Sequence, residues 1–241
     1  DQAPVYNAWN FTVHYTAGNN PALARTKVPA FLCPSNASTG PDPLGYGMTD
    51  YMPVAYTDLD LSGNRQANVQ GFDVKGALGF CNPIAYVTDG LSNTIMVFED
   101  SGRPTGNGGS YDISAGVTLG GAQVVDTTQL ASAKNQTPYL AGGNFGVPGR
   151  WADPDGASGV SGPPANRGPI INNNKIPAGG PSTCPWSTNN CGPNDEPFSL
   201  HVGGCHALMG DGAVRFISEN TDTQTIRRLC APKDGEVVGD F

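Results

Sequence analysis

Short apolar segments separated by turn residues run along nearly the whole chain, and only one stretch has clear helical periodicity. Segments of this kind, bounded by Gly, Pro, Asn, Asp and Ser, are typical of β-strands. The strongest predicted strand covers residues 94–99 (TIMVFE), after a turn or short helical cap at residues 89–93. Apolar and polar residues also alternate in residues 10–15 (NFTVHY), which predicts a second strand. Residues 28–34 (VPAFLCP) contain two prolines, which confine any strand there to a sheet edge. We therefore predict a mainly β fold of antiparallel sheets.

The C-terminal part predicts a hairpin followed by a short helix. Residues 206–209 and 213–217 are rich in apolar residues and flank a Gly-Asp-Gly turn. Residues 223–229 (TQTIRRL) carry the helical periodicity, with two arginines in the last turn. Thr221 or Asp222 can cap this helix.

Composition narrows the class of protein. The 241 residues suffice for one domain, and we see no linker that would divide 1–241. With 33 Gly and 21 Pro, we expect long ordered loops, above all between residues 106 and 194. The formal net charge of −8 leaves no basic stripe for phosphates, so we expect neither nucleic acid nor an anionic membrane surface as a partner. No apolar run is long enough to span a bilayer.

The chain has six cysteines, an even number, and no Cys-x-x-Cys pair. Together with many Asn, Thr, Ser and Gly, this favours an oxidising, extracytoplasmic setting and disulfides. Cys184 and Cys191 are the best single pair, since they bracket a short polar stretch. The cysteines whose pairing stays open are Cys33, Cys81, Cys205 and Cys230.

The cysteines and histidines of the C-terminal part also suggest a zinc cluster as an alternative to disulfides. Its members would be Cys184, Cys191, His201, Cys205 and His206. Their spacing fits no common structural zinc pattern, so disulfides are the preferred interpretation.

One acidic loop resembles the first half of a calcium loop. Asp58, Asp60, Ser62 and Asn64 supply oxygen atoms at alternate positions, and a glycine follows at the sixth. The twelfth position is Val69 rather than glutamate, so a bidentate ligand would have to come from elsewhere. The sequence gives a candidate Ca²⁺ site here, with a plain Asx-type turn as the alternative.

Several segments resemble a known family from end to end. The chain is similar to the planctomycete-type prepilin-like family of unassigned function, which is related to G-type pseudopilins of type II secretion. The matching segments are residues 2–7 (QAPVYN), 31–35 (FLCPS), 87–95 (VTDGLSNTI) with Glu99, 199–204 (SLHVGG), 209–217 (MGDGAVRFI) and 235–241 (GEVVGDF). The resemblance implies a pilin-like globular head and an N-terminal apolar helix that anchors the subunit in the membrane and later forms the core of a filament. We expect that helix upstream of these residues or removed in maturation. Since G-type pseudopilins bind calcium, the resemblance also favours the calcium loop.

The C-terminal signature of this family is a histidine followed after nine residues by Asp-Gly. Here these residues are His201, Asp211 and Gly212. We expect an imidazole–carboxylate hydrogen bond that ties a loop to the hairpin turn. A hydrolytic triad with Ser199 is rejected, because the chain has no Gly-x-Ser-x-Gly elbow and the serine and histidine are near neighbours.

We predict a structural protein rather than an enzyme, the head of a pilin-like subunit that associates with itself or with related subunits. Trp9, Trp151 and Trp186 are candidate interface anchors. The first alternative is a soluble Ca²⁺-dependent carbohydrate- or solute-binding protein of the cell envelope. The second is a hydrolase, for which Glu99 and Asp100 form a poor pair because neighbours on a strand point to opposite faces.

Overall fold

The computed structural model describes residues 2–36, 45–64, 74–79, 82–101, 117–119, 122–125, 149–153, 159–161, 169–172, 197–239 and 241. The helices in this part of the chain are α1 (Ala3–Ala8), α2 (Asn20–Leu23) and α5 (Thr223–Cys230), with 3₁₀ turns η1 (Pro29–Phe31), η2 (Ile84–Tyr86) and η3 (Leu91–Asn93). The strands are β1 (Tyr51–Pro53), β2 (Tyr56–Thr57), β3 (Val74–Lys75), β4 (Ile95–Glu99), β5 (Val117–Leu119), β6 (Ala122–Val125), β7 (Gly159–Val160), β8 (Gly204–Met209) and β9 (Val214–Ser218). Among these residues, no helix is both long and apolar enough to cross a membrane.

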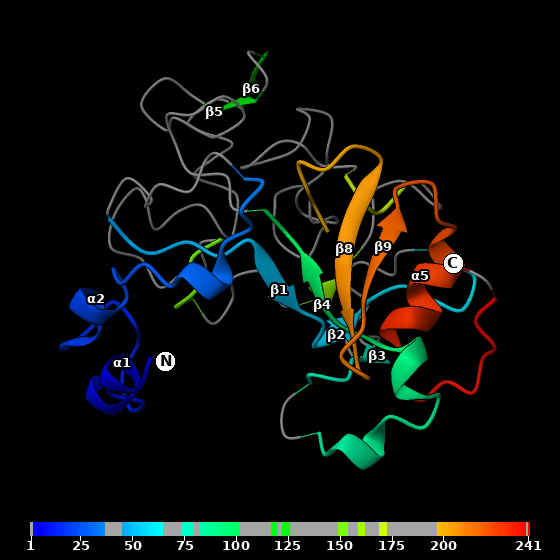
Figure 1. The fold of residues 1–241 in the computed structure, drawn as a ribbon, viewed down its shortest axis with the longest axis horizontal. Helices are drawn as coiled ribbons and strands as arrows, with labels where there is room; N and C mark the ends of the chain where they lie inside the picture. The colour runs from blue at the N-terminus through cyan, green and yellow to red at the C-terminus, as the bar shows by residue number, and fades with distance from the viewer. Residues whose placement is uncertain are drawn as a thin grey trace.

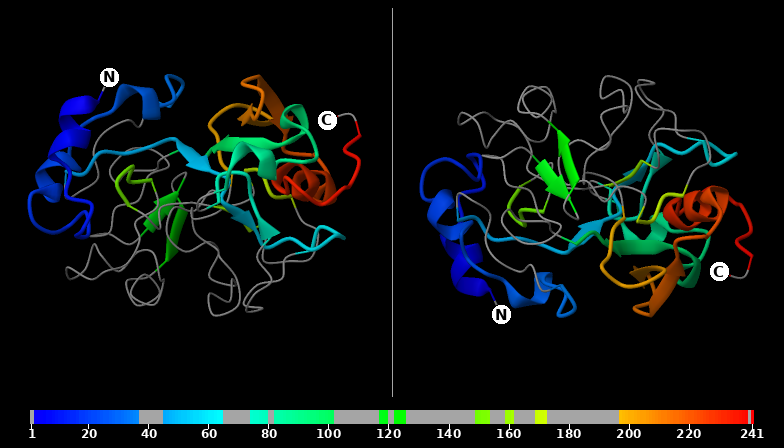
Figure 2. Two further views of the ribbon diagram at one scale, coloured as in Figure 1. Left: turned by 90° about the horizontal axis from the view of Figure 1, so that it is seen from below. Right: turned by 90° about the horizontal axis from the view of Figure 1, so that it is seen from above.

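The strands form a mainly antiparallel fold, which confirms the predicted class. The largest sheet has the order β1-β4-β8-β9, and every neighbouring pair in it is antiparallel. A second sheet has the order β3-β2-β7 with a parallel β2–β7 pair, and β5 pairs with β6. Figure 1 shows the four-stranded sheet at the centre of the molecule, with α5 beside it. Figure 2 shows α1 and α2 at one end and α5 at the other.

One face of the four-stranded sheet is packed in the core. Met52, Phe98 and Ala207 lie opposite one another on β1, β4 and β8, and all three are buried. From α5, Ile226 and Leu229 join the same cluster. Removal of these side chains from water is the main force that holds the sheet and α5 together.

A β-bulge in β4 decides which side chains face this core. Ile95 pairs with Met209 and Val97 with Leu208, so Met96 is an extra residue on β4. Ile95 and Phe98 are both buried in the core, although an uninterrupted strand would turn them to opposite faces. As a result Glu99, the last residue of β4, lies on the other face of the sheet.

The locally encoded elements are found where the sequence predicts them. The strand at residues 94–99 is β4, the turn before it is η3, and the C-terminal hairpin is β8–β9. Gly212 in the hairpin turn has a φ of 89°, a conformation that glycine adopts without strain. The predicted helix is α5, with Asp222 rather than Thr221 as its N-cap.

Two N-terminal predictions are wrong. Residues 10–15 form turns, not a strand, because the Asn20 side chain donates to the carbonyl oxygen of Asn10 and accepts from its backbone N–H. These groups are thereby unavailable for strand pairing. In residues 28–34 the chain forms the 3₁₀ turn η1 instead of an edge strand, with Pro29 as its first residue.

The N-terminal segments pack around a second, aromatic cluster. Tyr15 and Tyr46 are buried there, and the Arg150 guanidinium lies 4.3 Å from the centroid of the Tyr46 ring. Arg150 is only 1% exposed and donates to the Tyr15 hydroxyl at 2.8 Å. That hydroxyl donates in turn to Asp153 at 2.9 Å. Arg150 therefore fills the centre of this cluster.

Replacement of Asp222 by alanine is expected to lower the free energy of unfolding by about 1 kcal/mol. The Asp222 carboxylate accepts from the backbone N–H of Gln224 at 2.9 Å, which satisfies a donor in the first turn of α5. Urea unfolding measures the change. The control is Asp222→Asn, which keeps the acceptor and should stay close to the parent; an equal loss in both variants would contradict the capping role.

Candidate functional site

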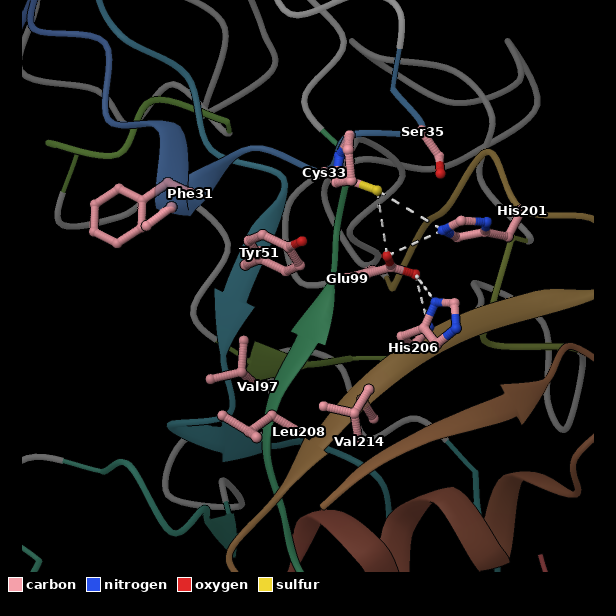
Figure 3. Close-up of a pocket in the computed structure, with 13 residues that line it drawn as sticks. Phe31, Cys33, Ser35, Tyr51, Val97, Glu99, His201, His206, Leu208 and Val214 are labelled. Carbon is pink, nitrogen blue, oxygen red and sulfur yellow. Dashed lines mark hydrogen bonds and ion pairs between the residues drawn. The ribbon is translucent and has the colours of Figure 1, made fainter. Parts of the chain in front are cut away.

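The face of the four-stranded sheet that is not packed in the core carries two cross-strand rows of side chains. The rows are Tyr51, Glu99, His206 and Phe216, and beside them Pro53, Val97, Leu208 and Val214. Most of these residues line an open cavity of about 680 Å³, whose further wall is made by the segment from Ala30 to Ser35 and by His201. The cavity is therefore apolar at one end and carries ionisable side chains at the other, as Figure 3 shows.

Glu99 is the centre of the polar end. Its side chain is 4% exposed, and Oε2 accepts from the backbone N–H of His206 at 2.6 Å and lies 3.2 Å from Nδ1 of the same residue. Its other oxygen, Oε1, lies 3.3 Å from Nε2 of His201 and 3.6 Å from Sγ of Cys33. Each carboxylate oxygen thus has its own set of partners (Figure 3).

The turn after η1 positions Cys33. Its backbone N–H donates to Asp50 Oδ2 at 2.7 Å, and the Asn36 side chain donates to Asp50 Oδ1 at the same distance. The backbone N–H of Asp50 donates to the carbonyl oxygen of Phe31. The Asp50 carboxylate therefore fixes both ends of the turn that holds the thiol beside Glu99.

The loop before β8 positions His201. Phe198 bridges to the end of β4, where its N–H donates to the carbonyl oxygen of Glu99. Ser199 Oγ then accepts from the backbone N–H of His201 at 3.0 Å, and the Ser199 N–H donates to Asn172 Oδ1. These bonds anchor the His201 backbone to the strand that bears Glu99.

Burial and negative neighbours govern the acidity of the site. Burial raises the pKa of the Cys33 thiol above its usual value, and the Glu99 carboxylate raises it further. Burial also raises the pKa of Tyr51 to about 12, with Cys33, Glu99 and Asp50 adding to the shift. Both groups are therefore neutral at pH 7.

The arrangement of Cys33, His201 and Glu99 differs from that of a catalytic triad, in which a base activates a nucleophile. In such triads the two imidazole nitrogens face different partners, one the nucleophile and one the carboxylate. Here one nitrogen, Nε2 of His201, lies 3.7 Å from Cys33 Sγ and 3.3 Å from Glu99 Oε1. The sulfur, nitrogen and oxygen atoms surround a common point instead of forming a chain.

The family model described as protein of unknown function (DUF1559, SBP_bac_10) matches residues 1–224. The chain belongs to the DUF1559 family. No curated protein and no solved structure matches it significantly. Cys33, Glu99, His201 and His206 all lie inside the part of the chain that this DUF1559 match covers.

The predicted bond between His201 and Asp211 is wrong. His201 precedes β8 and Asp211 follows it, so the six-residue strand separates them by roughly 20 Å. His201 faces Glu99 instead, and Asp211 Oδ1 accepts from the backbone N–H of Ala213 within the hairpin turn that also contains Gly212.

The candidate calcium loop folds as an Asx turn. Oδ1 of Asp60 accepts from the backbone N–H groups of Ser62 and Asn64, at 2.8 and 3.0 Å. Asp58 is buried beside this turn. The turn itself abuts α5, since the Gln224 side chain donates to the carbonyl oxygen of Leu61.

The cysteines in the described part of the chain are not in disulfides. Cys33, Cys205 and Cys230 are buried free thiols, so the disulfide prediction is wrong for these three. Their surroundings explain it: Cys33 faces Glu99 and His201, whereas Cys205 and Cys230 lie in the hydrophobic core. Cys81, Cys184 and Cys191 lie outside the described residues.

Two of the tryptophans contact each other. Trp9 and Trp151 have ring centroids 5.6 Å apart, and Trp151 Nε1 donates to the carbonyl oxygen of Thr26. Phe31, at the rim of the cavity, lies 6.4 Å from Trp151. Trp186 lies outside the described residues.

Sequence reasoning missed the meeting of Cys33, Glu99 and His201. The sequence did contain a signal for the site, because each of these three residues belongs to a different segment on which the resemblance to the prepilin-like family rests. Nothing in the spacing shows that the three segments converge, since Cys33 and His201 are 168 positions apart. In the zinc cluster drawn from the sequence, Cys205 is excluded because it points into the core while His206, its neighbour, faces the cavity.

Proposed function

We propose that the chain is the head domain of a pilin-like subunit of an extracytoplasmic assembly, and that it packs there through the open face of its four-stranded sheet. The observation that carries the proposal is the apolar character of this face. Val214 is 65% exposed and Phe216 46%, and Leu208 is also exposed. Antiparallel sheets with one solvated face usually carry polar residues on it, so an apolar row marks an interaction surface.

An apolar helix is the partner that fits this face. The resemblance to prepilin-like proteins implies such a helix at the N-terminal side of the head. The aromatic contacts from Trp9 through Trp151 to Phe31 join the end of α1 to the rim of the cavity. A helix that precedes α1, or the same helix of a neighbouring subunit, can reach the face along this path and cover the exposed row.

The test is electron microscopy of the protein isolated as the cell makes it, together with a Val214→Lys variant. Filaments, tubes or lattices are expected for the parent and their loss for the variant, since a charge in an apolar contact must be desolvated. The control is Val237→Lys, because Val237 is 80% exposed and does not line the cavity. Assemblies that survive Val214→Lys, or a parent protein that forms only small monodisperse particles, would overturn the proposal.

The second candidate is a solute-binding protein of the envelope, and the volume of the cavity favours it. About 680 Å³ lies within the range of ligand pockets, and the lining includes Val97, Leu208 and Val214. This lining suits a solute with an apolar body better than a sugar. Native mass spectrometry that finds a small molecule bound to monomeric particles would favour this function over assembly.

A further inference from the structure

The polar end of the cavity brings together three side chains with different donor atoms. Cys33 offers sulfur, His201 offers an imidazole nitrogen and Glu99 offers a carboxylate oxygen, and all three atoms lie within 4.8 Å of one another. The three residues come from separate segments, the turn after η1, the end of β4 and the loop before β8 (Figure 3). We propose that Cys33, Glu99 and His201 form a zinc site with an open fourth position that faces the cavity.

The distances between the donor atoms match those of a tetrahedral zinc site. Zinc bonds of about 2.3 Å to sulfur and about 2.1 Å to nitrogen and oxygen, at tetrahedral angles, place sulfur about 3.6 Å from each other ligand and nitrogen about 3.4 Å from oxygen. In the structure Cys33 Sγ lies 3.7 Å from His201 Nε2 and 3.6 Å from Glu99 Oε1, and the nitrogen and oxygen are 3.3 Å apart. A zinc ion therefore needs almost no movement of these side chains.

The donor set selects zinc over calcium or magnesium. Those two cations take oxygen ligands only, whereas a thiolate and an imidazole are typical ligands of zinc. When zinc binds, a Zn–S bond forms and the thiol proton of Cys33 leaves to solvent. Without metal, the Cys33 thiol and a protonated Nε2 of His201 can both donate to Glu99 Oε1, which holds the same three atoms in place.

Neighbouring groups orient the ligands before any ion arrives. Glu99 keeps Oε1 toward the site because Oε2 is held by the backbone N–H and the ring of His206. The backbone of Cys33 is fixed by Asp50, and that of His201 by Ser199. Such support from outside the ligand set is the rule at protein metal sites and strengthens binding.

The cavity is lined by all three proposed ligands, Cys33, Glu99 and His201. A molecule in the cavity can therefore contact an ion that they hold. Three protein ligands leave one tetrahedral position for water or for a donor atom of a molecule in the cavity. Tyr51 and Ser35 line the same end and can hydrogen-bond such a ligand. The site is thus suited to a ligand with an anionic or thiol head and an apolar body.

The experiment is zinc titration of the metal-stripped, reduced chain by calorimetry, with zinc X-ray absorption on the loaded protein. One Zn²⁺ per chain is expected, with one sulfur and otherwise nitrogen and oxygen ligands. Cys33→Ser and His201→Gln each remove a direct ligand and are therefore expected to weaken binding by at least the upper end of the about 10–100-fold that loss of an outer partner costs. The matched control for His201 is His14→Gln, since His14 hydrogen-bonds Thr16 away from the site.

Two results would overturn the proposal. One is zinc affinity that is unchanged in both Cys33→Ser and His201→Gln. The other is a spectrum of the parent with two or more sulfur ligands, which would place the ion at the remaining cysteines, and this spectrum is informative even if a variant fails to fold. Because the titration uses the unassembled chain, its outcome is independent of the microscopy that tests the pilin-like role.

Discussion

Replacement of Arg150 by leucine is expected to lower the free energy of unfolding by about 3–5 kcal/mol. The Arg150 side chain is buried, lies over the ring of Tyr46 and donates to the Tyr15 hydroxyl, which donates on to Asp153. Leucine removes the positive charge while the Asp153 carboxylate remains buried. Networks of this kind lose more than one bond when a central member is removed. Urea unfolding followed by tryptophan fluorescence measures the effect.

A second arginine provides the matched control. Arg25 also lies over the ring of Tyr46, with its guanidinium 5.0 Å from the centroid, but its side chain is exposed. Arg25→Leu is expected to cost no more than about 1 kcal/mol, because an exposed cation–π contact is weak. Similar losses in the two variants would show that contact with Tyr46, and not the buried charge network, sets the cost.

Zinc is expected to raise the free energy of unfolding by about 4 kcal/mol when its free concentration is a thousand times its dissociation constant. The three ligands are held on separate segments of the chain, so the unfolded chain does not present them together. An ion that binds only the folded form stabilises it by mass action. Thermal unfolding at increasing zinc concentration measures the gain as a rising Tm.

Variants separate this gain from non-specific effects. In Cys33→Ser the gain at the same zinc concentration should fall from about 4 to about 1.4 kcal/mol or less, as expected for a site at least 100-fold weaker, whereas His14→Gln should respond as the parent does. Glu99→Gln keeps an acceptor for the His206 N–H, so it tests the charge on Glu99 with little change to the sheet. A Tm that rises equally in the parent and in Cys33→Ser would place the stabilising ion elsewhere.

Local patterns predict the elements whose cause is local. β4, the β8–β9 hairpin and α5 follow from apolar periodicity, a glycine turn and an N-cap, which all act within a few residues. Residues 10–15 have the alternation of a strand, yet no strand forms there. The reason is a single side chain, Asn20, whose hydrogen bonds to the backbone of the segment replace those of a sheet.

The site could not be predicted in the same way. Its residues come from three segments whose meeting depends on the order of the strands in the sheet. The sequence did identify His201 as a candidate, but gave it the wrong partner because the C-terminal signature of the prepilin-like family contains both His201 and Asp211. Strict alternation along 94–99 would also have placed Glu99 on the same face as Ile95, in the core.

The extra residue in β4 has an evolutionary consequence. Met96 is the extra residue of β4, since its neighbours Ile95 and Val97 pair with consecutive residues of β8. Deletion of its codon would therefore restore the regular alternation of side chains between the two faces of the sheet. Such a deletion would leave Phe98 in the core and Glu99 beside Cys33 and His201, because the residues after Met96 would keep their partners on β8. A relative with one residue fewer between Ile95 and Glu99 would therefore retain this site, as long as the cysteine, the glutamate and the histidine are kept.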